Sequence, residues 1–181
     1  FKHEAKPSVG QKYSNTGSKG TYKIVGEAVL IVTKLQEIGV LVDTVNHDAK
    51  RFELAYTYAE FSAGSFDFSE AVQLGSELVK LSLARTDVAN DDLKKLKQLS
   101  SIEYLDLSRT RVGDEGVTHL AELPKLSYLN LRDTNVSDGS IEQLARMTNL
   151  EQLYLWGSQF TRSGVLALQE RLPETAIVFD T

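Results

Sequence analysis

Pairs of leucines separated by one residue recur along the second half of the chain at a constant spacing. The pairs begin, 24 residues apart, at Leu81, Leu105, Leu129 and Leu153. The alternation within each pair predicts a short β-strand whose leucines point inward, and the later apolar positions Val117, Leu120 and Leu123 predict one face of a helix packed behind it. Neither element buries its apolar side alone, so the pattern predicts units that share a core with their neighbours.

The repeated unit has the form L-x-L-x-x-T-x-V-x-x-x-x-V-x-x-L-x-x-L-x-x-L-x-x, as in LDLSRTRVGDEGVTHLAELPKLSY followed by LNLRDTNVSDGSIEQLARMTNLEQ. Its period falls within the interval of a leucine-rich repeat. The unit resembles the ribonuclease-inhibitor-like and cysteine-containing types, with Thr where those carry Asn or Cys. The resemblance implies an α/β fold, a short right-handed solenoid with parallel strands on the concave face and helices on the convex face.

The segment before the regular units predicts a cap. Residues 27–39 have helical spacing and end on a glycine, and residues 40–45 and 51–56 alternate as strands. The second strand falls where a repeat strand would lie, with residues 68–78 as its helix. We therefore expect an α/β N-terminal cap and imperfect first repeat over 24–79, and four regular repeats and a closing strand over 80–181. Residues 1–23, with five lysines among small polar residues, predict a flexible linker.

Composition excludes several function classes. A net charge of −5 argues against nucleic acid as a partner, and the absence of cysteine excludes thiolate catalysis and Cys-ligated metals within the chain. No apolar run is long enough to predict insertion in a membrane. The first residue, Phe1, favours a processed or excised piece of a longer protein. We expect no cofactor.

Two polar columns accompany the repeats. Hydroxyls occupy the end of each strand at Thr86, Thr110, Thr134 and Ser158, where they suit a turn that needs local hydrogen bonds. Asn or Asp precedes the helical segment at Asn90, Asp114 and Asp138, which suits helix capping; one carboxylate per unit is too few for calcium.

The histidines do not form a constellation. His3, His47 and His119 fall in the linker, a turn and a helix, and we expect them to be exposed. The sequon Asn135-Val136-Ser137 is short enough to arise by chance. Because no histidine is expected to meet an acid or a nucleophile, we predict no catalytic residue and no enzyme activity.

The positions flanking the leucines point away from the core and form the candidate binding surface. The residues expected on it are Tyr104, Asp106, Arg109, Tyr128, Asn130, Arg132, Asp133, Tyr154 and Trp156. Tyrosine, tryptophan and arginine are the usual anchors of protein interfaces. The alternative is that the tyrosines only pack against each other across neighbouring strands.

The strings LARTDV, LSRTRVGDEGV, LRDTNVSD and LYLWGSQFTRSGVLALQERLP resemble the repeat tails of planctomycete-type cytochrome c domain-containing bacterial proteins. The resemblance implies an upstream haem domain in the same polypeptide, joined by residues 1–23, and an extracytoplasmic, periplasmic or membrane-anchored location. It also implies that Trp156 belongs to a closing repeat and serves the cap.

The function that these patterns favour is non-enzymatic recognition of a partner, which we expect to be a protein, through the concave sheet. Two alternatives are a carbohydrate-binding accessory module, because aromatic side chains stack on sugar rings, and a structural spacer attached to the c-type cytochrome domain.

Overall fold

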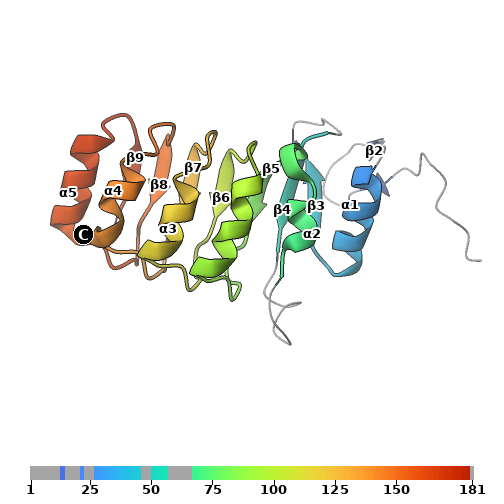
Figure 1. Cartoon of the computed structure of the whole chain (residues 1–181), viewed down its shortest axis with the longest axis horizontal. Helices are drawn as coiled ribbons and strands as arrows, with labels where there is room; N and C mark the ends of the chain where they lie inside the picture. Colours follow the sequence, from blue (N-terminus) through green and yellow to red (C-terminus); the bar gives the residue numbers. More distant parts are fainter. Residues whose placement is uncertain (1–12, 15–20, 23–26, 46–49, 57–66, 180–181) are drawn as a thin grey trace, which may run out of the picture.

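The computed structural model describes residues 13–14, 21–22, 27–45, 50–56 and 67–179. Within them one sheet has the order β3-β4-β5-β6-β7-β8-β9 and runs the length of the molecule, with the helices in a layer on one side (Figure 1). Its strands are β3 Leu41–Thr44, β4 Phe52–Ala55, β5 Leu78–Ser82, β6 Tyr104–Asp106, β7 Tyr128–Asn130, β8 Gln152–Tyr154 and β9 Ala176–Val178. Strands β3 and β4 pair antiparallel, and the later pairs are parallel. The predicted α/β solenoid is confirmed.

The register of the parallel strands follows the 24-residue spacing. Leu81 pairs with Leu105, Leu105 with Leu129, Leu129 with Leu153, and Leu153 with Ile177. The leucines of these pairs are fully buried. The residues that flank each leucine are exposed on the opposite face of the sheet. Equivalent positions of successive repeats therefore lie side by side in rows across the sheet.

The helical layer consists of α1 Glu27–Glu37, α2 Ser69–Val72, η3 Gly75–Glu77, η4 Asn90–Gln98, α3 Asp114–Leu120, η5 Asp138–Ser140, α4 Ile141–Leu144 and α5 Arg162–Arg171. The prediction of a regular helix in every unit is wrong for two units. The first unit has the 3₁₀ helix η4 in its place, and the third has η5 followed directly by α4. A 3₁₀ helix rises about 2.0 Å per residue instead of about 1.5 Å. Within the same period, the nine residues of η4 therefore extend further along the helix axis than the seven residues of α3.

Two further expectations for the cap change. The single helix expected over 68–78 is broken into α2 and η3, and Gly75, the first residue of η3, has a φ of 51°. In α1 the buried side is formed by Ala28, Val32 and Leu35, whereas Leu30 and Ile38, which share the helical spacing, are exposed. In the segment expected as a linker, the described residues form the antiparallel pair β1 Tyr13–Ser14 and β2 Thr21–Tyr22; the rest of residues 1–23 lies outside the described chain.

The hydroxyl column closes the turn after each strand, as predicted. The hydroxyls of Thr86, Thr110, Thr134 and Ser158 each donate to the carbonyl three residues earlier, over 2.6–2.7 Å. The three threonines are buried. A buried carbonyl without a partner would cost about 1–3 kcal/mol, so each hydroxyl stabilises its turn.

The Asn and Asp column does not cap its own helices, contrary to expectation. The N-cap positions are Ala89, Gly113, Ser137 and Thr161. Each Asn or Asp is the first helical residue, and its side chain reaches the following unit. Asn90 accepts the N–H of Gly113, Asp114 accepts the N–H and hydroxyl of Ser137, and Asp138 accepts those of Thr161. These bonds form a ladder that ties each unit to the next.

Candidate functional site

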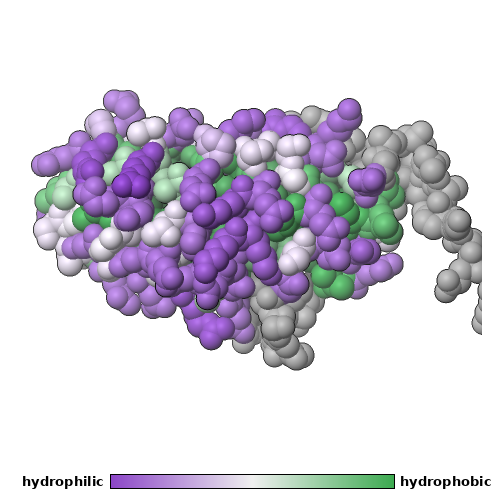
Figure 2. Space-filling view, viewed as in Figure 1, coloured by the Kyte–Doolittle hydropathy of each residue, from purple (hydrophilic) through white to green (hydrophobic). Residues whose placement is uncertain are grey.

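The candidate surface is built by β6, β7 and β8 together with the turns that follow them. Alternate residues of these strands are fully buried leucines, and the residues between them lie partly exposed on the side away from the helices. We call this side the sheet face. The opposite, helix-bearing face is largely hydrophilic over the middle of the solenoid (Figure 2).

Three tyrosines form a row of rings on the sheet face. Tyr104 and Tyr128 lie at directly paired positions and stack, with ring centroids 4.1 Å apart and planes inclined by 14°. Tyr154 lies diagonally from Tyr128, at 5.2 Å and 39°. Burial raises the pKa of Tyr104 and of Tyr128 above the ordinary tyrosine value, so both phenols are neutral near pH 7. The row is a rigid, uncharged aromatic platform.

Trp156 extends this platform beyond the end of β8. Its side chain remains 38% exposed. The guanidinium carbon of Arg132 lies 4.0 Å from the ring centroid, which is a cation–π contact between neighbouring units. The contact covers one face of the indole with a positive charge.

The residues at the strand ends are held in an unusual backbone conformation. Arg85, Arg109 and Asp133 have φ values of 62°, 58° and 53°, and Gly157 occupies the same position in the fourth unit at 69°. Their backbones are fixed between units, because the N–H of Arg109 donates to the carbonyl of Arg132 and the N–H of Asp133 donates to that of Trp156. A left-handed turn thus aims the side chains of this row.

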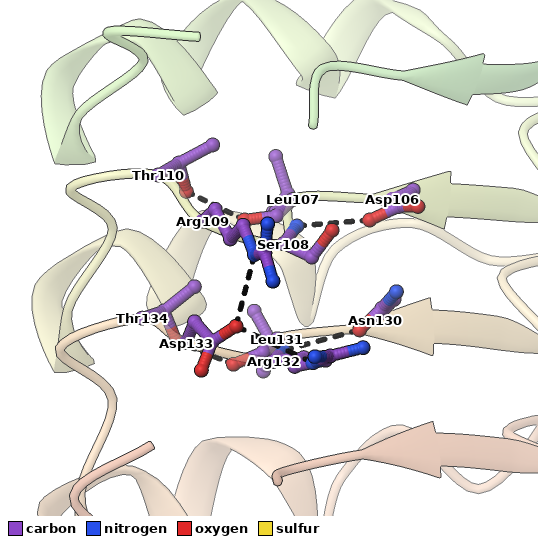
Figure 3. A network of polar contacts seen from close by, with 10 residues as sticks. All are labelled: Asp106, Leu107, Ser108, Arg109, Thr110, Asn130, Leu131, Arg132, Asp133 and Thr134. Carbon is purple, nitrogen blue, oxygen red and sulfur yellow. Dashed lines mark hydrogen bonds and ion pairs between the residues drawn. The ribbon is translucent and has the colours of Figure 1, made fainter. Parts of the chain in front are cut away.

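The side chains of Arg109, Arg132 and Asp133 meet above these turns (Figure 3). Oδ2 of Asp133 lies 3.1 Å from Nε of Arg109 and 3.3 Å from Nε of Arg132. The first contact is a hydrogen bond; the second is a charge contact only, because the buried Nε of Arg132 has no hydrogen-bond partner among the described residues. We call these three residues the Arg–Asp–Arg triad.

Asp106 and Asn130 have a structural role. Oδ1 of Asp106 accepts the N–H of Ser108 over 2.9 Å, and Oδ1 of Asn130 accepts the N–H of Arg132 over 3.1 Å (Figure 3). Both side chains are therefore occupied in closing the strand-end turns.

A family model described as leucine-rich repeat matches residues 98–121. Among solved structures, internalin C2 of Listeria monocytogenes is 27% identical over 63% of this chain, with a TM-score of 0.52. A leucine-rich-repeat protein of Leptospira interrogans is 22% identical over 64% of the chain, with a TM-score of 0.51. The leucine-rich-repeat ectodomain of a receptor kinase from Arabidopsis thaliana is 17% identical over 88% of the chain, also with a TM-score of 0.51, and 94% of that ectodomain is covered.

The chain therefore has a leucine-rich-repeat fold, and one of its repeats matches the leucine-rich-repeat family model. It spans 46% of the length of the internalin chain and 28% of that of the Leptospira protein. No curated protein matches it significantly. The narrower resemblance to haem-domain proteins is not carried by these matches and stays a prediction.

In this leucine-rich-repeat frame, a row of charges that the sequence did not reveal continues the sheet face onto the cap. Glu53 of β4 pairs with Lys80 at 3.3 Å, and Arg51 donates to Glu103 over 2.7 Å. The register between β4 and β5 shifts at Phe52, so the constant spacing that locates the later columns does not extend to Arg51 and Glu53. A strand register that included the irregularity would have been needed to find them.

The expectation that His119 is exposed is wrong. It is half-buried on α3, and its Nε2 is buried without a hydrogen-bond partner among the described residues. His3 and His47 lie outside the described residues. Over the described chain, no group of three or more His, Cys, Asp or Glu residues could hold a metal ion, and no helix there is long and apolar enough to cross a membrane.

Proposed function

We propose that this leucine-rich-repeat protein recognises a partner protein non-covalently through its sheet face. The observation that carries the proposal is the exposed Trp156, held by Arg132 at the end of a row of packed tyrosines. Aromatic and arginine side chains of this kind carry most of the free energy of protein interfaces. Leucine-rich repeats are typical of protein-binding modules, which supports the same conclusion.

The packing of the rings divides the surface into a support and an anchor. Tyr104 and Tyr128 stack on each other, so much of their area is already buried in the free protein. Tyr154 and Trp156 lie at the end of the row, and Trp156, which is 38% exposed, has aromatic surface left for a partner. Because stacking and the cation–π contact already order these side chains, binding would cost less conformational entropy than ordering free ones.

A pull-down with quantitative mass spectrometry tests the proposal. The full chain is compared with the Tyr128→Ala, Tyr154→Ala, Trp156→Ala triple variant and with Leu166→Ala, which removes a 61% exposed side chain from α5 on the helix-bearing face. We expect proteins captured by the wild type and by Leu166→Ala to be lost by the triple variant. Retention by a folded triple variant contradicts the proposal and favours a spacer role beside another domain.

Carbohydrate recognition is the second candidate, and Trp156 is the residue that could stack on a sugar. One face of its ring is covered by Arg132, which leaves less flat aromatic surface for a sugar than an open indole offers. A glycan array separates the two: specific glycan binding lost in Trp156→Ala would favour the carbohydrate function. An extracytoplasmic location, proposed from the resemblance alone, is tested by fractionating cells that express the full-length gene product.

A further inference from the structure

The row of strand-end turns carries a positive charge on a protein that is negative as a whole. Arg85 and the Arg–Asp–Arg triad place three guanidinium groups and one carboxylate in this row, whereas the net charge of the chain is −5. Asp106 lies near the same turns and keeps its charge while its Oδ1 accepts the N–H of Ser108, so three positive and two negative groups still leave a net charge of +1. The local sign therefore differs from that of the whole molecule, which favours an anionic group on the partner.

The two arginines and one aspartate of the triad carry a net charge of +1. A single oxygen of Asp133 contacts both arginines, and it does so through their Nε atoms. No hydrogen bond joins the terminal nitrogens of Arg109 or Arg132 to another described residue, and the two side chains are 46% and 40% exposed. Those terminal N–H groups form the fork that binds a carboxylate with two parallel hydrogen bonds.

We propose that the partner presents an acidic peptide segment, with an Asp or Glu side chain on the fork of Arg109 or Arg132 and an apolar or aromatic neighbour on Tyr154 and Trp156. This inference rests on the proposed function and narrows the class of partner. One carboxylate balances the one charge that Asp133 leaves uncompensated. A phosphate dianion would bring a second negative charge close to Asp133, which makes it the poorer fit.

The arginines are already ordered for such a ligand. The left-handed turn and the bond from the N–H of Arg109 to the carbonyl of Arg132 fix where the first side chain leaves the backbone. The contact with Trp156 holds the second guanidinium beside the platform. A partner carboxylate therefore meets two positioned forks next to exposed aromatic surface, rather than two freely rotating side chains.

The test selects peptides from a random phage-displayed library on the full chain and measures the Kd of the enriched sequences as synthetic peptides. We expect an excess of Asp or Glu beside aromatic or large apolar residues. The Arg109→Gln, Arg132→Gln double variant should weaken binding by about ten-fold or more, because it removes both guanidinium groups that could donate to the peptide carboxylate. Arg146→Gln, an exposed arginine on the helix-bearing face, is the matched control and should leave the Kd unchanged.

Replacing the acidic residue of the peptide by its amide should give a similar loss against the wild type and little further loss against the double variant, since both changes remove the same contact. Circular dichroism of each variant verifies folding. Peptides without an acidic excess, or a Kd unaffected by the double variant, overturn the acidic inference; if those peptides still need Trp156, the proposed function stands. A selection that yields no peptide dependent on Trp156 overturns both, and a phosphorylated peptide that binds more tightly than its Asp or Glu counterpart overturns the choice of carboxylate.

Discussion

Replacing Gly164 by alanine should destabilise the protein, although alanine is normally preferred to glycine within a helix. Gly164 lies in the first turn of α5, and a methyl group there would stand 2.0 Å from Oδ1 of Asp138. To make room, this carboxylate must break the two hydrogen bonds that it accepts from the N–H and the hydroxyl of Thr161, over 2.9 and 2.5 Å. The substitution therefore breaks one rung of the ladder between the third and fourth units.

The expected size follows from opposing terms. Hydrogen bonds to a charged acceptor contribute about 1.5–3 kcal/mol each, and the lower end applies to this pair near the surface, so two bonds amount to about 3 kcal/mol. Alanine returns about 1 kcal/mol through its helix propensity. The net loss of unfolding free energy is about 2 kcal/mol, or a fall in Tm of about 4–8 °C for a chain of this size.

Urea denaturation followed by far-UV circular dichroism measures this loss. In an Asp138→Ala background the methyl group has room, and Gly164→Ala should be neutral or stabilising by up to about 1 kcal/mol. Gly113→Ala is the matched control, because its added methyl would lie 3.6 Å from the nearest atom, an ordinary contact. The reasoning is refuted if Gly164→Ala stabilises the wild type, or changes stability equally in both backgrounds.

Four other experiments test the turns, the cap and the site. Arg85→Gly should raise the free energy of unfolding by up to about 1 kcal/mol in urea denaturation, because glycine adopts the left-handed backbone conformation without strain. Thr110→Val should lower it by about 1–2 kcal/mol, because it removes the buried hydroxyl hydrogen bond, whereas Thr110→Ser keeps that bond. The hydrogen bond from Lys95 lowers the pKa of Asp67 from 3.8 to about 2, so its contribution is present above pH 4 and lost as pH falls towards 2; Asp67→Asn should flatten the stability profile between these values. Trp156 is the only tryptophan, so its emission should shift to the blue when a selected peptide buries it, and an unchanged spectrum at saturation would contradict its role as an anchor.

The sheet was predictable from the sequence because its register follows directly from the constant spacing. Once Leu81, Leu105, Leu129 and Leu153 are known to be equivalent, the pairing of the strands from β5 to β8 is set, and so is the proximity of Tyr104 to Tyr128. The helical layer was less predictable, because the sequence fixes only how many residues each unit has for the crossing. Units with the same 24-residue period form η4 in one case and the regular helix α3 in the next, so the period alone does not determine the helix type.

The candidate site divides in the same way. That Arg132 and Trp156 are neighbours follows from the period, but the cation–π contact depends on side-chain conformations that no spacing defines. The ladder escaped prediction because an Asp at the start of a helix usually satisfies its own helix, whereas Asp114 and Asp138 instead meet the backbone of the next unit. These hydrogen bonds depend on how neighbouring units pack against each other, which the sequence of a single unit does not define.

The row of left-handed residues separates what the fold needs from what a partner would use. The turn requires a positive φ, and Gly157 shows that the fourth unit meets this requirement with the residue that bears it at least cost. The other units place Arg85, Arg109 and Asp133 there, at a cost of about 1–2 kcal/mol each relative to an unstrained residue. The side chains of Arg109 and Asp133, 46% and 32% exposed, interact with each other instead of packing into the leucine core. Departures from local preference of this kind are typical of functional surfaces, so the strained row supports the strand-end turns as the part of the sheet face that a partner contacts.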